Sequence, residues 1–111
     1  MTAALADRPP LRDLAELAQS AQAAARLLKL MASEHRLLLL CRLIEGEASV
    51  GALAEHAGMA QSATSQHLAK MRGEGLVATR REAQSIYYRL RDPAAVRVLE
   101  ALCDIYRRPS A

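Results

Sequence analysis

The stretch that decides the fold is residues 49–91, which reads SVGALAEHAG over 49–58, MAQSATSQHLAKMRGEG over 59–75 and LVATRREAQSIYYRLR over 76–91. Its first part predicts a helix over 50–57. Ser49 can cap that helix, and Gly58 can end it because glycine adopts the left-handed backbone of a tight turn. After this turn a second helix is predicted over 61–73.

Beyond Gly75 the apolar residues change from helical spacing to strict alternation. Ile86, Tyr88 and Leu90 share one side of an extended segment, which is typical of a strand. We therefore expect a β-hairpin over 76–91 with its tip near residues 82–84. Two short helices joined by a tight turn and followed by such a hairpin make a winged helix-turn-helix, an arrangement that reads duplex DNA.

Two helices are predicted before this stretch. Residues 11–32 are Ala-rich with apolar residues at helical spacing, and they read as one long helix whose seam suits either a second copy or its own domain. Ser33 can cap a helix over 34–45, which Gly46 closes. Residues 1–10 are expected to form a disordered tail. The buried stripe of the 34–45 helix is expected to be Leu37, Leu40, Cys41 and Ile44.

A last helix is predicted over 93–107, with Asp92 as its N-cap and Pro93 as its first residue. Its apolar stripe has the spacing of two helices that pack together. With 111 residues, the chain has room for one modest core, so residues 11–111 are expected to form a single mainly helical domain with a small β-hairpin wing. The stripe consists of Val96, Leu99, Cys103 and Tyr106.

Composition favours a small helical domain that contacts an acidic partner. Hydrophobic residues make up 51% of the chain, with three Tyr, no Phe and no Trp, so Leu, Ala, Val and Ile must fill the core. Residues 61–91 have a net charge of +4. The whole chain has a net charge of +3, so the remaining residues together carry −1. Such a basic segment suits phosphate binding, although a solvated charged face is the simpler interpretation.

No signal or membrane segment is evident in the sequence, so we expect the protein to be in the cytoplasm, where thiols stay reduced.

The second helix of a helix-turn-helix places its N-terminal half at the base edges of the major groove. Thr64, Leu68 and Met71 are expected to face inward, and His67 is expected to be a neutral hydrogen-bonding residue at the edge of the groove. Short polar side chains on the outer face can read bases, and basic ones can meet phosphates or the minor groove. The expected base readers are Gln61, Ser62, Ser65 and Gln66, and the expected backbone and wing contacts are Lys70, Arg72, Arg80, Arg81 and Gln84.

The run MASEHRLLLLCRLIEGEASVGALAEHAGMAQSATSQHLAKMRGEGLVATRREAQSIYYRL, over 31–90, resembles the ArsR/SmtB family of bacterial winged-helix repressors. The resemblance implies a homodimer joined by the first and last helices, a palindromic promoter operator on double-stranded DNA, and release by an inducer. One departure concerns the reading helix. Where this family usually has Ser, the chain has Ala60, so that helix lacks a side-chain cap worth about 0.5–2 kcal/mol.

The family's common metal sites are not present in this sequence. Ser49, Val50 and Gly51 stand where many relatives carry Cys-Val-Cys, and no His follows His67. No metal and no cofactor are therefore expected. What remains is Cys41 and Cys103, whose placement resembles the sulfide-responsive SqrR and BigR type of repressor in this family. That resemblance implies that reactive sulfur species join the two thiols through sulfur atoms and that the protein then leaves DNA. Arg107, one turn beyond Cys103, is placed to favour its thiolate.

Three alternatives stay open at this point. A repressor of the same fold could respond to an oxidant through a direct disulfide, or to another ligand with the cysteines as core packing. A thiol enzyme or persulfide carrier is disfavoured because the chain has no Cys-x-x-Cys, no His near either Cys and no Gly-rich phosphate loop, so no catalytic residue is assigned. Non-specific, architectural binding of nucleic acid would need only the basic segment.

Overall fold

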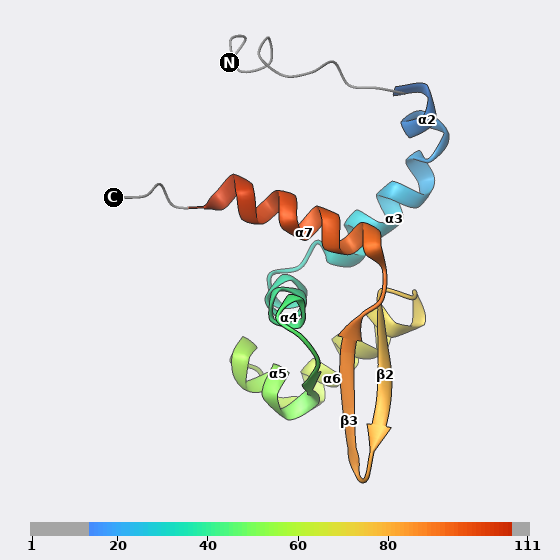
Figure 1. Ribbon diagram of the computed structural model, residues 1–111. Coiled ribbons are helices and arrows are strands. Elements are labelled where there is room, and N and C mark those ends of the chain that lie inside the picture. Colours follow the sequence, from blue (N-terminus) through green and yellow to red (C-terminus); the bar gives the residue numbers. More distant parts are fainter. Residues whose placement is uncertain (1–13, 108–111) are drawn as a thin grey trace.

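The computed structural model describes residues 14–107 and is mainly helical with a small three-stranded sheet. Figure 1 shows α4 near the centre, α7 crossing beside it, and the β2–β3 hairpin extending away as the wing. The predicted winged helix-turn-helix is confirmed. The tail predicted over 1–10 lies outside the described residues. The elements are α2 Leu14–Gln19, α3 Ala21–Met31, α4 Glu34–Ile44, β1 Ala48–Ser49, α5 Val50–Ala57, α6 Gln61–Gly73, β2 Val77–Glu82, β3 Ser85–Leu90 and α7 Pro93–Tyr106.

The single long helix predicted over 11–32 is wrong, because the described part of it is broken at Ser20. The Ser20 N–H donates to the carbonyls of Glu16 and Leu17, both at 3.0 Å, and α3 then starts at the next residue. Serine weakens a helix interior because its hydroxyl competes for backbone groups. Within residues 14–107 no residue of α2 is buried, so no core packing there holds the two helices in line.

The other predicted helix starts are confirmed in their hydrogen bonds. The Ser33 hydroxyl accepts from the Arg36 N–H at 3.3 Å, and Ser49 caps α5 through the Ala52 N–H at 3.2 Å. The Asp92 carboxylate accepts from the Ala94 N–H at 2.9 Å, with Pro93 as the first residue of α7. Each cap satisfies a backbone donor that the first turn of a helix leaves free.

The predicted end of the first helix of the motif, at Gly58, is confirmed. Gly58 adopts φ +66 at the end of α5, in the left-handed region, and so makes the tight turn into α6. In contrast, Ala60 precedes α6 with extended backbone and no side-chain cap. In the helix-turn-helix, α5 thus ends with a glycine C-cap, whereas α6 starts without a side-chain N-cap.

The sheet contains one strand that the sequence did not reveal. Its order is β1–β3–β2, with both pairs antiparallel, and Ala48 of β1 lies opposite Tyr88 of β3. In the hairpin, Val77 pairs with Leu90 and Glu82 with Ser85 around the turn. β1 has only two residues, too few for alternation to mark it, yet it fastens the wing to the segment that leads into α5.

The core differs from the predicted stripe of α4. Leu39, Leu40 and Leu43 are buried, whereas Cys41 is exposed and Ile44 is 40% exposed. The reason is that α4 packs on α5, β3 and α7, so its buried arc is turned toward those elements. Of the predicted last-helix stripe, Leu99 is buried while Cys103 and Tyr106 are exposed. No helix in the described residues is long and apolar enough to cross a membrane.

Candidate DNA interface and cysteine pair

One face of α6 is polar and exposed, as predicted. Thr64, Leu68 and Met71 are buried, and the Thr64 hydroxyl donates to the Ala60 carbonyl at 3.0 Å, so the inward face is fully paired and apolar. The opposite face offers short donors and acceptors to a base edge and cations to phosphates. Its exposed residues are Gln61, Ser62, Ser65, Gln66, Lys70 and Arg72.

Gln61, although exposed, leans toward the preceding helix. A Cβ built on Gly51 of α5 would lie 3.4 Å from its Nε2 atom. The small residue at 51 therefore leaves room for the amide, which rests between the two helices of the motif. The other predicted base readers, Ser62, Ser65 and Gln66, are also exposed on α6.

His67 is a half-buried residue with a defined partner. Its Nδ1 accepts a hydrogen bond of 3.1 Å from Nε of Arg36 on α4, and its ring stacks on His35 with 6.1 Å between centroids. Burial, followed by the charges of Arg36 and His35, lowers the pKa of His67 below its ordinary value. The predicted neutral imidazole agrees with this direction, but its hydrogen bond joins α6 to α4. No spacing in the sequence marks Arg36 as that partner, because it lies 31 residues before His67.

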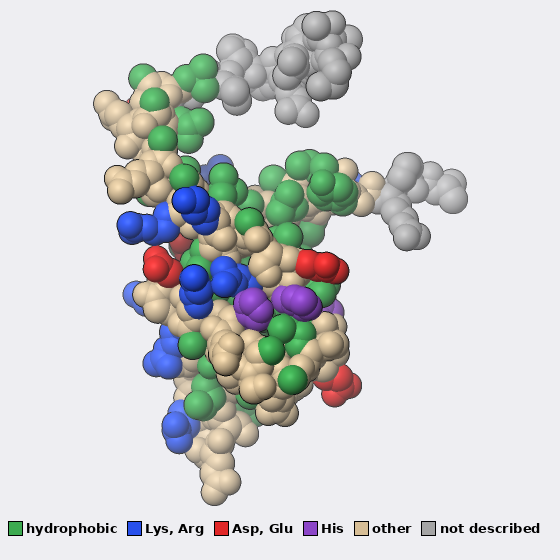
Figure 2. All heavy atoms as spheres, turned by 180° about the vertical axis from the view of Figure 1, so that it is seen from behind, with side chains coloured by type: hydrophobic (Ala, Val, Ile, Leu, Met, Phe, Trp, Pro, Cys, Tyr) green, Lys and Arg blue, Asp and Glu red, His purple; other side chains and the backbone are tan. Residues whose placement is uncertain are grey.

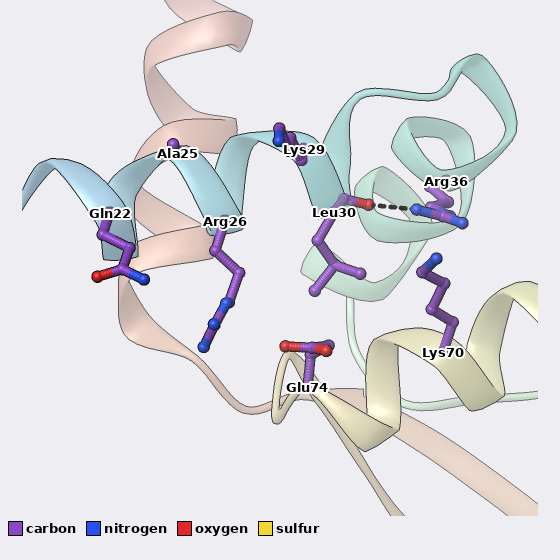
Figure 3. A pocket seen from close by; sticks show the side chains of 8 residues that line it. All are labelled: Gln22, Ala25, Arg26, Lys29, Leu30, Arg36, Lys70 and Glu74. Atoms are coloured by element: carbon purple, nitrogen blue, oxygen red, sulfur yellow. Dashed lines mark hydrogen bonds between the residues drawn. The ribbon is translucent and has the colours of Figure 1, made fainter.

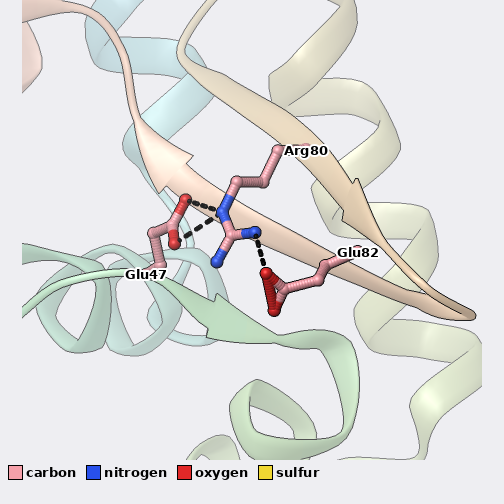
Figure 4. Close-up of polar contacts among 3 residues, drawn as sticks. All are labelled: Glu47, Arg80 and Glu82. Atoms are coloured by element: carbon pink, nitrogen blue, oxygen red, sulfur yellow. Dashed lines mark hydrogen bonds and ion pairs between the residues drawn. The ribbon is translucent and has the colours of Figure 1, made fainter.

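The predicted wing residues differ in their contacts within the chain. Arg81 and Gln84 are exposed near the tip. Arg80 is held: its Nε donates to both carboxylate oxygens of Glu47 at 2.9 Å, and its Nη1 lies 3.3 Å from Glu82 (Figure 4). Its guanidinium carbon also lies 4.8 Å from the centre of the Tyr87 ring. A phosphate would have to compete with these groups for Arg80.

Cys41 of α4 and Cys103 of α7 line the same apolar hollow, of about 440 Å³. Both are free thiols exposed on the surface of the chain, and neither belongs to the buried core. Core packing of the two cysteines within the single chain, one of the alternatives, is thus wrong. The side chains around them are Leu37, Leu99, Leu102 and Tyr106.

The electrostatics of this hollow disfavour a charged Cys41. Burial, and then the charge of Cys103, raises the pKa of Cys41 above its ordinary value of 9.0. Arg107 does not stand free beside Cys103, because its Nη2 lies 3.7 Å from a carboxylate oxygen of Asp104. Within residues 14–107 no group of three or more His, Cys, Asp and Glu side chains could hold a metal.

Basic side chains gather on the face that Figure 2 shows, beside the histidines and along one edge toward the wing. In the same region, a hollow of about 400 Å³ between α3 and α6 includes Arg26, Lys29, Arg36 and Lys70 in its wall, with Glu74 as its acid. A surface of this charge attracts the phosphates of a nucleic acid.

Comparison with known proteins agrees with these observations. Residues 33–79 match the model of the family described as "Bacterial regulatory protein, arsR family". The nodulation protein NolR of Rhizobium meliloti is 50% identical over 88 residues, which cover 79% of this chain and 72% of NolR. These regulators are not enzymes.

Solved structures share the fold over most of the chain. The transcriptional repressor BigR from Xylella fastidiosa superposes with a TM-score of 0.80 and 38% identity, covering 85% of this chain and 96% of BigR. The homodimeric winged helix-turn-helix DNA-binding domain of a possible ArsR-family regulator from Mycobacterium bovis gives a TM-score of 0.69 and 28% identity, covering 86% and 89%. The chain belongs to the arsR family of bacterial regulatory proteins and is a transcription regulator of that family.

Proposed function

We propose that this protein is a homodimeric repressor that binds a palindromic operator and leaves it when sulfur bridges Cys41 and Cys103. The observation that carries the proposal is the hollow that both thiols line. A bridge there ties α4, which packs on α5 of the reading motif, to α7, the last helix, which also packs on α4. Changing the relation of two packed helices is a common way to switch a protein between two states.

Apolar side chains at both ends of the described chain support the dimer. Leu14 and Leu17 of α2 are 59% and 57% exposed, and Ile105 and Tyr106 of α7 are 67% and 78% exposed. Burying a large apolar side chain contributes about 1.5–3 kcal/mol, which favours pairing these helices with a second copy. The related Mycobacterium bovis domain is a homodimer. A two-fold dimer presents its two α6 helices to an inverted repeat.

The bridge forms without a further oxidant when the inducer is a persulfide, RSSH. Cys41 takes the outer sulfur and releases RSH, and the resulting protein persulfide attacks the inner sulfur of a second RSSH and releases H₂S. Cys103 then attacks the middle sulfur atom and releases RSH. The products are one sulfur atom between the two Sγ atoms, two RSH and one H₂S. The two thiols are oxidised, and one persulfide sulfur is reduced to sulfide.

The first test treats the reduced dimer with glutathione persulfide and measures intact mass and peptide maps. We expect a peptide pair linked from Cys41 to Cys103 with extra sulfur. Binding is followed by fluorescence anisotropy on a duplex that the reduced protein selects from a random-sequence pool. A coupling typical of allosteric switches lowers affinity about 5- to 150-fold.

Matched variants separate the alternatives. Cys41→Ser and Cys103→Ser should bind the selected duplex but resist release, and release of both variants by persulfide would overturn the proposal. Equal release by hydrogen peroxide with a direct disulfide would favour an oxidant sensor. Non-specific binding predicts similar affinity for all duplexes, whereas a repressor prefers its operator by about 10³ or more.

A further inference from the structure

Three helices meet at one side chain, that of Arg36 at the start of α4. Its Nε donates to Nδ1 of His67 on α6 at 3.1 Å, and its Nη1 donates to the carbonyl oxygen of Leu30 near the end of α3 at 3.0 Å. Figure 3 shows the bond to Leu30 and Lys70 pointing from α6 toward the same guanidinium. Arg36 therefore links α4 to the preceding helix α3 and also to α6, whose His67 lies 31 residues farther along the chain.

We propose that Arg36 and His67 are positioning residues that hold α6, the DNA-reading helix, against α4, the helix that carries Cys41. The inference rests on the proposed function, since it names a contact through which a change at Cys41 reaches the reading helix. Cys41 lies on α4 little more than one turn beyond Arg36.

The position of α6 depends strongly on such a contact. The helix starts at Gln61 after an uncapped Ala60, and its first turn has no acidic residue to complement the helix dipole. Within residues 14–107, the Arg36–His67 bond is the one hydrogen bond that joins a side chain of α6 to a side chain of another element. Apolar packing alone has no direction, whereas a hydrogen bond fixes one orientation of the helix.

The bond requires a neutral imidazole. Nδ1 accepts from Arg36, so the ring proton resides on Nε2, and protonation of Nδ1 would remove the acceptor and set two cations face to face. From α4, His35 and Arg36 face the ring. Lys70 is one turn away on α6, and the hollow that Arg36 and Lys70 share also includes Lys29 of α3 and the acid Glu74.

The remaining elements packed on α6 place their charges elsewhere. On α5, Glu55 and His56 are exposed, and on β2 the charged residues Arg80, Arg81 and Glu82 lie toward the hairpin tip. His67 thus lies in a mainly basic surrounding, which together with burial lowers its pKa. At neutral pH the pair is intact, and it breaks as pH falls through the lowered pKa of His67.

The direction in which DNA affinity changes on acidification distinguishes two roles for His67. A histidine that contacts a phosphate binds DNA more tightly as it becomes charged, so affinity rises on acidification. A histidine that accepts from Arg36 loses its bond on protonation, so affinity falls. His67→Asn provides the reference, because an Asn amide oxygen can stand near the position of Nδ1 and does not titrate.

The experiment measures operator affinity of the full-length reduced protein at pH 7.5 and 5.5, at constant ionic strength, with each variant compared with itself. Dividing the pH effect of the wild type by that of His67→Asn removes the pH effects that do not depend on His67. We expect the wild type to lose about 2- to 10-fold in affinity relative to His67→Asn on acidification, the range that one hydrogen bond supplies. A relative gain would show a phosphate contact, and no difference would show no role; either overturns the proposal.

A second arm tests transmission from the cysteines. The factor by which glutathione persulfide lowers operator affinity should be smaller in Arg36→Lys, which keeps the charge but lacks the planar fork, than in the wild type. An unchanged factor overturns the coupling. If persulfide does not release the wild type but the acid-induced loss is present, the sensing proposal fails and the positioning pair stands. Circular dichroism verifies the fold, and the pH comparison does not depend on Arg36→Lys.

Discussion

Arg80 of the wing lies with its Nε 2.9 Å from both carboxylate oxygens of Glu47, a residue that immediately precedes β1. The same guanidinium lies 4.8 Å from the centre of the Tyr87 ring on β3. The pair links the outer strand of the wing to the segment that enters the helix-turn-helix. It also withholds from DNA a cation that the sequence predicts as a wing contact.

Replacing Glu47 should release that cation. We expect Glu47→Ala to bind all duplexes more tightly at low salt and to steepen the dependence of log affinity on log salt by about 0.9 for each phosphate newly contacted. The thermal midpoint should scarcely change, because both partners are partly exposed and such pairs contribute little to stability. Anisotropy titrations at several salt concentrations measure the slope.

The control for this prediction is Glu45→Ala. Glu45 is exposed and lies two residues before Glu47, and among the described residues it forms no ion pair. Glu45→Ala therefore changes the net charge by the same amount as Glu47→Ala but does not free Arg80. If both variants change the salt slope equally, the effect comes from net charge, and the Arg80–Glu47 contact does not restrain the wing.

The raised pKa of Cys41 predicts how its reactivity depends on pH. The thiolate is the nucleophile, so alkylation of Cys41 by iodoacetamide should rise with pH and reach half its maximum rate above the ordinary value of 9.0. In Cys103→Ser the midpoint should fall but stay raised, since burial is the larger cause and Cys103 the smaller. Quantitative mass spectrometry of the Cys41 peptide gives the rates. The denatured protein is the reference, and a native midpoint at or below that of the denatured chain would contradict the prediction.

Local chemistry made much of the fold predictable. Ser33, Ser49 and Asp92 each cap the helix assigned to them, because a cap needs only a short side chain and the next few backbone N–H groups. The hairpin register follows from alternation, and the outward face of α6 follows from helical spacing. These features depend on neighbours within a few residues.

The errors come from contacts that are distant in sequence. Burial on α4 depends on where α5, β3 and α7 dock, so periodicity alone placed Cys41 in the core. The partners of Arg80 and His67, Glu47 and Arg36, lie more than 30 residues away and have no spacing that marks them. The sequence does not mark the break at Ser20, because the Ala-rich pattern continues through it and the continuity of the helix depends on packing.

The uncapped start of α6 predicts a stabilising substitution. Ala60 already has the extended backbone of an N-cap, φ −65 and ψ 148, so the hydroxyl of Ala60→Ser can accept from a free N–H of the first turn. We expect the free energy of unfolding to rise by about 0.5–2 kcal/mol, measured by urea denaturation at fixed protein concentration. The control is Ala69→Ser at an exposed position inside the same helix, where serine is less favourable than alanine. Equal changes in the two variants would rule out capping as the cause.

Two residues one turn apart on the exposed face of α6 should contribute to DNA binding in different ways. Gln66→Ala should weaken binding to the selected operator by about 1–3 kcal/mol and leave mixed-sequence DNA unaffected, because glutamine reads a base edge. Lys70→Ala should weaken both and lower the salt slope by about 1, because lysine meets a phosphate.

The control for Gln66→Ala is Gln22→Ala on α3, which removes the same amide group, and the control for Lys70→Ala is Arg97→Ala on α7, which also removes one positive charge. Both control residues are exposed. Affinity for both duplexes is measured across salt concentrations. If Gln66→Ala weakens both duplexes equally, Gln66 contacts the backbone. If Lys70→Ala lowers the preference for the operator at an unchanged slope, Lys70 reads a base, and the boundary between base-reading and phosphate-binding residues on α6 lies farther along the helix.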